Sequence, residues 1–238
     1  MATMLRSKAA AAFLILAGLL VGLKLLFDYY PGDFPLRDQA SAFDWMTIAS
    51  ILILAALGFL ADRSIGFPEP FADAGRERLG FLTALSLGAA YGGLTIALDV
   101  ALPSNHPLST GGSDHVAIPW SIPFYLFGAI FLEFFLRLGA VCVVVWFVHV
   151  LILRRRFKLV VFWIVACIVA AYEVLPYVME DVAEQRWTEV ALAPLQPLYW
   201  TNVFEGWLLL RFGWFAPIVF RLAFYLVWHV IYGGLGPY

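Results

Sequence analysis

Apolar runs about as long as a bilayer is thick dominate this sequence. A transmembrane α-helix needs roughly 20 apolar residues to cross about 30 Å of hydrocarbon. Seven such runs predict seven spans, at residues 9–27, 45–61, 79–101, 122–153, 158–177, 190–210 and 213–233. The sixth run contains Pro194 and Pro197, which predict irregular first turns. We therefore predict an all-α, polytopic membrane helical bundle of about seven transmembrane helices, formed as a single domain over residues 1–238.

The composition excludes several other classes of protein. Of the 238 residues, 63% are hydrophobic and 13% are charged, whereas a soluble domain has about 45–50% apolar and about 25% charged residues. The net charge of −2 provides no basic surface for nucleic acid. A soluble enzyme, a nucleic-acid-binding protein and a disordered chain are thereby excluded, and the lipid bilayer is the first expected partner. Cys142 and Cys167 lie within apolar runs, where a small buried side chain is expected rather than a disulfide.

The distribution of basic residues predicts the orientation. Short loops on the cytoplasmic side of membrane proteins are enriched in Lys and Arg. One side of the predicted topology holds Arg6, Lys8, Arg63, Arg76, Arg78, Arg154, Arg155, Arg156, Lys158 and Arg211. The other side holds only Arg37 and Arg186. We predict a cytoplasmic N-terminus, an uncleaved first span and a C-terminus outside; the alanine-rich spans and short loops favour a bacterial inner membrane.

Ionisable residues within the spans need a physical reason, because each costs about 2.5–3.5 kcal/mol on insertion scales. Six of them lie in or near the spans, three of each sign: Lys24, Glu133, Arg137, Glu173, Glu205 and Arg221. Lys24 is close to the outer end of its span, where its side chain can reach the interface and act as an anchor. The other five are expected to find partners inside the bundle.

Helical spacing groups these residues on shared faces. Glu133 and Arg137 are four residues apart, and Arg221 is followed at the same interval by Tyr225 and His229. The resulting polar intramembrane network is predicted to contain Glu133, Arg137, Asn202, Glu205, Arg221, Tyr225 and His229. Such residues either hold a bundle together through interhelical hydrogen bonds and ion pairs, or line a polar cavity for chemistry or transport.

The remaining histidines give weaker signals. His149 is near the basic cluster that begins at Arg154, where packing at the interface is expected. His106, Asp114 and His115 occupy a Gly/Ser/Pro-rich external loop, but their spacing matches no closed zinc site. We predict no metal and no cofactor.

Three segments of the second half have a motif-like spacing of charged residues, asparagine, glycine and proline: FLEFFLRLG at 131–139, FWIVACIVAAYEVLP at 162–176, and the segment 201–229. They resemble motifs of the CPBP family, the CAAX-protease-like intramembrane endopeptidases. FLEFFLRLG is similar to the first motif, in which two adjacent glutamates are followed after three residues by arginine. FWIVACIVAAYEVLP, at 162–176, resembles the helix with the second motif, which usually ends in a histidine before Leu-Pro. In the segment 201–229, Asn202, Gly206, Arg211 and Gly213 match the family's closing region. The resemblance covers about residues 120–238.

The departures from these motifs concern the catalytic positions. Leu132 stands in the place of the first glutamate and Val174 in that of the second motif's histidine. Arg221 replaces the third motif's histidine, and Tyr225 occupies the family's Asn/Asp position. Peptide hydrolysis needs a base and donors aimed at the oxyanion, which leucine and valine cannot supply. We assign no catalytic residue; if the chain is active, Glu133 and Arg137 are the candidates.

Three functions follow as hypotheses. The first is a catalytically inactive CPBP-like protein that acts as a structural or interaction subunit of a membrane complex, with Glu133 and Arg221 neutralising each other. The second is an active intramembrane endopeptidase that uses Glu133 as base. The third is a small transporter or lipid handler that uses the polar interior, although the sequence lacks the paired broken helices of transporters.

Overall fold

The computed structural model describes residues 2–30, 43–102 and 115–235, and within these ranges every regular element is a helix. Six helices in this part of the chain are long and apolar enough to cross a membrane: Lys8–Tyr29, Trp45–Ile65, Ala74–Ala101, Ser121–Ile152, Lys158–Ala183 and Phe215–Tyr232. They match the predicted spans one to five and seven. The prediction of a polytopic helical membrane bundle is confirmed.

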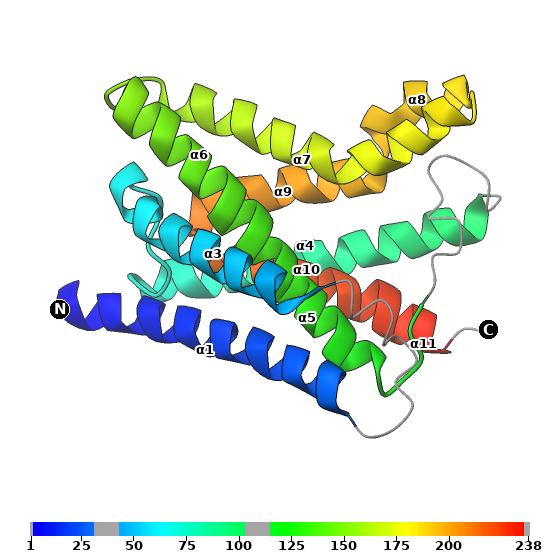
Figure 1. Cartoon of the computed structure of the whole chain (residues 1–238), viewed down its shortest axis with the longest axis horizontal. Helices are drawn as coiled ribbons and strands as arrows, with labels where there is room; N and C mark the ends of the chain where they lie inside the picture. The colour runs from blue at the N-terminus through cyan, green and yellow to red at the C-terminus, as the bar shows by residue number, and fades with distance from the viewer. Residues whose placement is uncertain (1, 31–42, 103–114, 236–238) are drawn as a thin grey trace.

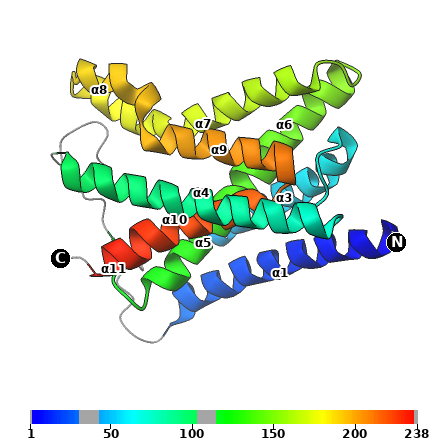
Figure 2. The ribbon, with the colours of Figure 1, turned by 180° about the vertical axis from the view of Figure 1, so that it is seen from behind.

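The helices alternate in direction through the bundle. They are α1 (Ala2–Tyr29), α3 (Trp45–Ile65), α4 (Ala74–Ala101), α5 (Ser121–Glu133), α6 (Val143–Val145), α7 (Lys158–Ala183), α8 (Trp187–Leu192), α9 (Pro197–Phe212), α10 (Phe215–Tyr225) and α11 (Gly233–Leu235). In both views the start of α1 and the connection from α6 to α7 lie at one end, while α8 and α11 lie at the other (Figures 1 and 2). The arginines at 154–156 are in that α6–α7 connection. The bundle thus has a basic end, which contains the start of α1.

The fourth span is one long helix with two widened segments. After α5, a π-helical stretch (Phe134–Cys142) leads into α6, and a second π-helical stretch (Trp146–Ile152) follows. This helix runs diagonally through the bundle between α1 and α7 (Figure 1). π-helical turns are rare and are frequently found at functional sites. Arg137 lies in the first of them.

The sixth predicted span, 190–210, is divided rather than continuous. It consists of α8, a 3₁₀ turn (Ala193–Leu195) and α9. Proline has no amide hydrogen and fits the first helical turn, so α9 begins at Pro197. With 16 residues, α9 is about 24 Å long at 1.5 Å per residue, less than the hydrocarbon thickness. It packs along α7. The expected irregular start is therefore confirmed, and the count of full-length spans among the described residues is six instead of seven.

Two glycines allow segments to approach closely. A Cβ on Gly58 of α3 would lie 1.8 Å from the Leu138 carbonyl oxygen, so the contact between α3 and the first π-helical stretch requires glycine. Gly213, between α9 and α10, has a φ of +89°, and a Cβ there would lie 2.3 Å from the Pro68 carbonyl oxygen. The second contact fixes the α3–α4 loop against the turn that reverses the chain into α10.

Candidate functional site

Buried charged residues from four segments meet in the middle of the bundle. Glu133 is the last residue of α5, Arg137 lies in the following π-helical stretch, Asn202 and Glu205 are on α9, and Arg221 is on α10. All five are buried, with at most 1% of their surface exposed. We call these five residues the buried ionic network.

The closest contact across the bundle joins Arg221 to Glu133. The Arg221 Nε donates to Glu133 Oε1 at 2.6 Å, and both side chains are 1% exposed. The Arg221 Nη2 also donates to Glu205 Oε2 at 2.6 Å and to Asn202 Oδ1 at 3.3 Å. One guanidinium thus connects α5, α9 and α10. A planar guanidinium with five N–H groups suits such bridging, which a lysine ammonium does less well.

Arg137 makes the second set of ionic contacts. Its Nη2 donates to Asn202 Oδ1 at 2.6 Å and to the Asn202 carbonyl oxygen at 3.2 Å, and it forms a salt bridge with Glu205. Its Nε lies 3.6 Å from Glu133 Oε2, the intrahelical pair expected from the four-residue spacing. Each glutamate of the network therefore contacts both arginines, and the two formal charges of each sign balance.

Two further residues lie beside Arg221. Glu173 Oε1 of α7 accepts from Arg221 Nη1 at 3.5 Å, with 17% of its side chain exposed, and the Tyr225 hydroxyl oxygen accepts from the same nitrogen at 3.5 Å. Glu173 was recognised in the sequence as an ionisable residue near a span end, but no helical spacing linked it to the others. Only the packing of α7 brings it to Arg221.

His229 belongs to a different group of side chains. Its Nδ1 lies 3.1 Å from His115 Nδ1, and its ring stacks on Tyr125 with the centroids 4.0 Å apart. It touches Tyr225 edge-on at 5.1 Å between centroids, and its polar contact is with His115 instead of with the buried ionic network. Of the seven predicted network residues, the structure brings six together and places His229 at their outer edge.

Several polar atoms of the site lack hydrogen-bond partners among the described residues. They are Glu133 Oε2, Glu205 Oε1, Glu173 Oε2 and Arg137 Nε. A partly satisfied buried network is costly, because the low dielectric strengthens both the bonds that form and the penalty for those that do not. The packing of the surrounding helices is therefore needed to keep these side chains in place, because their own hydrogen bonds are incomplete.

The chemistry open to this site is limited by its arginines. An arginine stays charged and cannot take a proton from water. Glu133 has one oxygen bonded to Arg221 and the other 3.6 Å from Arg137. Two pockets, of about 340 Å³ and about 320 Å³, are lined by residues outside the network. The geometry of the site is that of two carboxylates and two guanidinium groups that neutralise each other.

Other sequence candidates have local partners. Lys24 is buried and pairs with Asp28, one turn further along α1. His149 Nδ1 lies 3.0 Å from the Arg156 carbonyl oxygen, in the basic cluster where it was expected to pack. Both cysteines are free thiols. Asp62 is a further buried acid, 4% exposed near the end of α3. It was not predicted as a residue inside the membrane because it follows directly after the predicted span.

Metal ligation was considered at His106, Asp114 and His115. The first two lie outside the described residues. Within the ranges that the structure describes, no three His, Cys, Asp or Glu side chains are grouped to hold a metal ion.

No family model, curated protein or solved structure matches this chain.

Proposed function

We propose that this integral membrane protein is a catalytically inactive relative of the CPBP intramembrane proteases that acts as a structural or interaction subunit in a larger membrane complex. The proposed location is the bacterial inner membrane, which the alanine-rich spans and short loops favour. The contact between Arg221 and Glu133 is the observation that carries the proposal.

The convergence of the resembling segments supports the family relationship. The residues that match or replace the CPBP motifs come from distant parts of the chain: Glu133 and Arg137, Glu173 beside Val174, Asn202, and Arg221. All of them lie within one set of contacts. A protease with these motifs needs such a convergence, because its base and its oxyanion donors must reach one substrate carbonyl.

The contents of the site support the loss of catalysis. Arg221, in the place of the third motif's histidine, donates its Nε to Glu133 at 2.6 Å. That contact occupies one oxygen of the carboxylate, and the other oxygen lies 3.6 Å from Arg137 Nε, so both face cations of the chain itself. Leu132 and Val174 add only apolar surface at the other two positions.

The subunit role follows from what remains. Within the buried ionic network each carboxylate contacts both guanidinium groups, so we assign the role of the protein to its surface instead of to this interior. The long helices present large apolar side chains outward, among them Ile15 on α1, Ile53 on α3 and Ile168 on α7. Lipid covers such side chains, and so does another membrane protein.

The experiment combines a search for partners with a test for proteolysis. The full chain is purified from native membranes in mild detergent, crosslinked beforehand, and analysed by mass. We expect another integral membrane protein in a fixed ratio. A lone monomer at every step contradicts the subunit role.

The same preparation distinguishes the endopeptidase hypothesis. Candidate transmembrane substrates are incubated with the wild-type protein and with Glu133→Ala. We expect no cleavage by either. Cleavage by the wild type that disappears in Glu133→Ala contradicts inactivity and identifies Glu133 as the base.

A further inference from the structure

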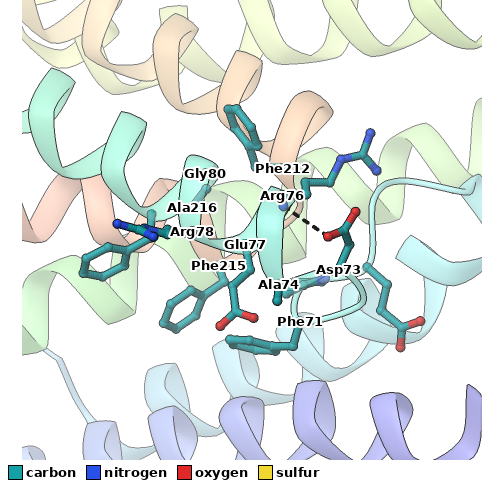
Figure 3. Close-up of a pocket in the computed structure, with 13 residues that line it drawn as sticks. Phe71, Asp73, Ala74, Arg76, Glu77, Arg78, Gly80, Phe212, Phe215 and Ala216 are labelled. Carbon is teal, nitrogen blue, oxygen red and sulfur yellow. Dashed lines mark hydrogen bonds between the residues drawn. The ribbon is translucent and has the colours of Figure 1, made fainter. Parts of the chain in front are cut away.

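A pocket of about 340 Å³ lies at the basic end of the bundle, between the start of α4 and the turn that joins α9 to α10. The α3–α4 loop forms one wall, and residues of α9 and α10 form another. Figure 3 shows the side chains that line it. None of them belongs to the buried ionic network, so the proposed function makes no use of this pocket.

Two aromatic rings and a carboxylate share one side of the pocket. The rings of Phe71 and Phe215 have centroids 5.2 Å apart and are tilted by 56°. In Figure 3 the Glu77 side chain points toward the side on which these two rings stand. Phe71 has a φ of +67°, a conformation that a phenylalanine adopts only when its surroundings impose it. Aromatic faces next to a carboxylate are a favourable environment for an organic cation.

The pocket also contains a carboxylate oxygen without a hydrogen-bond donor among the described residues. Glu69 lines the pocket, and its Oε1 is buried with no hydrogen bond to any described residue. Asp73 is already engaged, because its Oδ1 accepts from the Gly75 amide at 2.8 Å and caps α4. Glu69 and Glu77 are therefore the acids of the pocket that remain for a ligand. A primary ammonium can donate hydrogen bonds to such oxygens, whereas a fully methylated ammonium cannot.

The other charges of the pocket favour an anion. Arg76 and Arg78 line it, and a guanidinium group pairs well with a phosphate. The lining thus combines both signs of charge, which complements a ligand that carries a phosphate and an ammonium.

The surface next to the pocket fits an acyl chain. Phe81 lines the pocket and is 45% exposed, and the exposed apolar face of α4 continues with Leu82 and Leu85. A lipid with its headgroup in the pocket places its chains along this face.

We propose that this pocket binds the headgroup of a phospholipid with a primary ammonium, of the phosphatidylethanolamine class. The ammonium lies at Glu69 and Glu77, against the rings of Phe71 and Phe215. The phosphate lies at one guanidinium group of the lining, because the Arg76 and Arg78 side chains point to different sides in Figure 3.

The test measures lipid binding to the detergent-purified full chain by native mass spectrometry. Short-chain phosphatidylethanolamine, phosphatidylcholine and phosphatidylglycerol are titrated separately. We expect phosphatidylethanolamine to bind about tenfold more tightly than phosphatidylcholine, because only the former donates charge-assisted hydrogen bonds. Phosphatidylglycerol, which has no cation, is expected to bind at least as weakly as phosphatidylcholine.

Variants locate the effect in the pocket. Glu77→Gln and the double variant Glu69→Gln/Glu77→Gln are expected to reduce the preference for phosphatidylethanolamine, the double variant to less than about twofold. Glu180→Gln, an exposed site near the end of α7, is the matched control and keeps the full preference. Equal binding of the two zwitterionic lipids, tighter binding of phosphatidylglycerol, or a preference unchanged in the double variant overturns the proposal. None of these results depends on whether the chain is a complex subunit.

Discussion

Charged side chains meet in two very different regions of this molecule: the middle of the bundle, and the end at which α7 leads into α8, here called the outer end. In the middle, Arg221 Nε lies 2.6 Å from Glu133 Oε1, with both side chains 1% exposed. At the outer end, Arg186 Nη2 lies 2.6 Å from Asp181 Oδ1, with 41% of the arginine side chain exposed. The two ion pairs are equally short, so distance alone does not tell them apart.

The difference lies in what happens when one partner is lost. Exposed charges are screened by water and salt, and removing one leaves the other solvated. A charge in the middle of the bundle cannot return to water, and its partner becomes an uncompensated buried charge. The hydrogen bond to Asp181 raises the pKa of the Arg186 guanidinium above its ordinary value, but this arginine is charged at any physiological pH with or without that shift. We therefore expect the loss of Arg221 to destabilise the fold strongly and the loss of Arg186 to destabilise it little.

The largest effect is expected for Arg221→Gln. This change leaves Glu133 and Glu205 with a single guanidinium between them. We expect the free energy of unfolding to fall by about 3–5 kcal/mol, measured as loss of helical circular dichroism on titration of the detergent-solubilised protein with a denaturing detergent. An unchanged unfolding curve would show that the two regions do not differ.

The next effect is the coupling between Glu133 and Arg221. We expect the double variant Glu133→Gln/Arg221→Gln to be more stable than the sum of the two single effects predicts, by about 0.5–3 kcal/mol. Arg221→Gln alone is expected to cost more than Glu133→Gln alone, because Arg221 also contacts Glu205 at 2.6 Å. Strict additivity would mean that this pair is absent in the folded protein.

A much smaller effect is expected for Arg186→Gln at the outer end. The Arg186 side chain is 41% exposed, and of its partners Glu184 is 53% and Asp181 10% exposed. Because the guanidinium itself is in contact with water, the melting temperature is expected to change by no more than about 2 °C. The comparison is made by thermal unfolding at low and high salt, and the difference from wild type is expected to disappear at high salt. A loss as large as that of Arg221→Gln would remove the distinction between the regions.

The smallest effect concerns the start of α3. Asp44 Oδ1 accepts from the Thr47 amide at 2.7 Å, and hydrogen bonds from Thr47 hold the pKa of Asp44 below its ordinary value. A carboxyl with a lowered folded pKa stabilises the fold above the unfolded pKa, about 3.9, and this contribution is lost as the pH falls through the folded value.

Asp44→Asn tests this cap directly. Asparagine caps helices about as well as aspartate, so we expect equal melting temperatures near pH 7. Between about pH 5 and about pH 3 the wild type should lose slightly more stability than the variant. Parallel pH profiles for the two proteins would contradict a contribution from the charged cap.

The length and hydrophobicity of the apolar runs predicted most of the membrane spans. Six of the seven predicted spans correspond to long helices, because about 20 consecutive apolar residues have few alternatives to a membrane helix. The sixth was divided at the two prolines that had marked it as irregular. The short length of α9 could not be predicted from hydropathy, because hydropathy depends on side chains and does not show where a backbone hydrogen bond is missing.

The sequence predicted which residues belong to the candidate site better than it predicted which of them are in contact. Spacing of four residues predicted that Glu133 and Arg137 share a face. The same rule grouped His229 with Arg221, but the segment Leu226–Tyr232 is π-helical. Instead, His229 pairs with His115, which is distant in the sequence.

The sequence by itself determined that this chain lies in a membrane, that its spans are helical, and that five charged groups in those spans need partners. These conclusions follow from the cost of exposing polar groups to hydrocarbon, which is the same wherever the residue lies. Only the tertiary structure decided that Arg221 reaches Glu133 and Glu205 together, that Glu173 joins them from α7, and that Glu77 shares a pocket with Phe71 and Phe215. Those contacts depend on how α5, α7, α9 and α10 cross, which is set by packing between helices and not by any single segment.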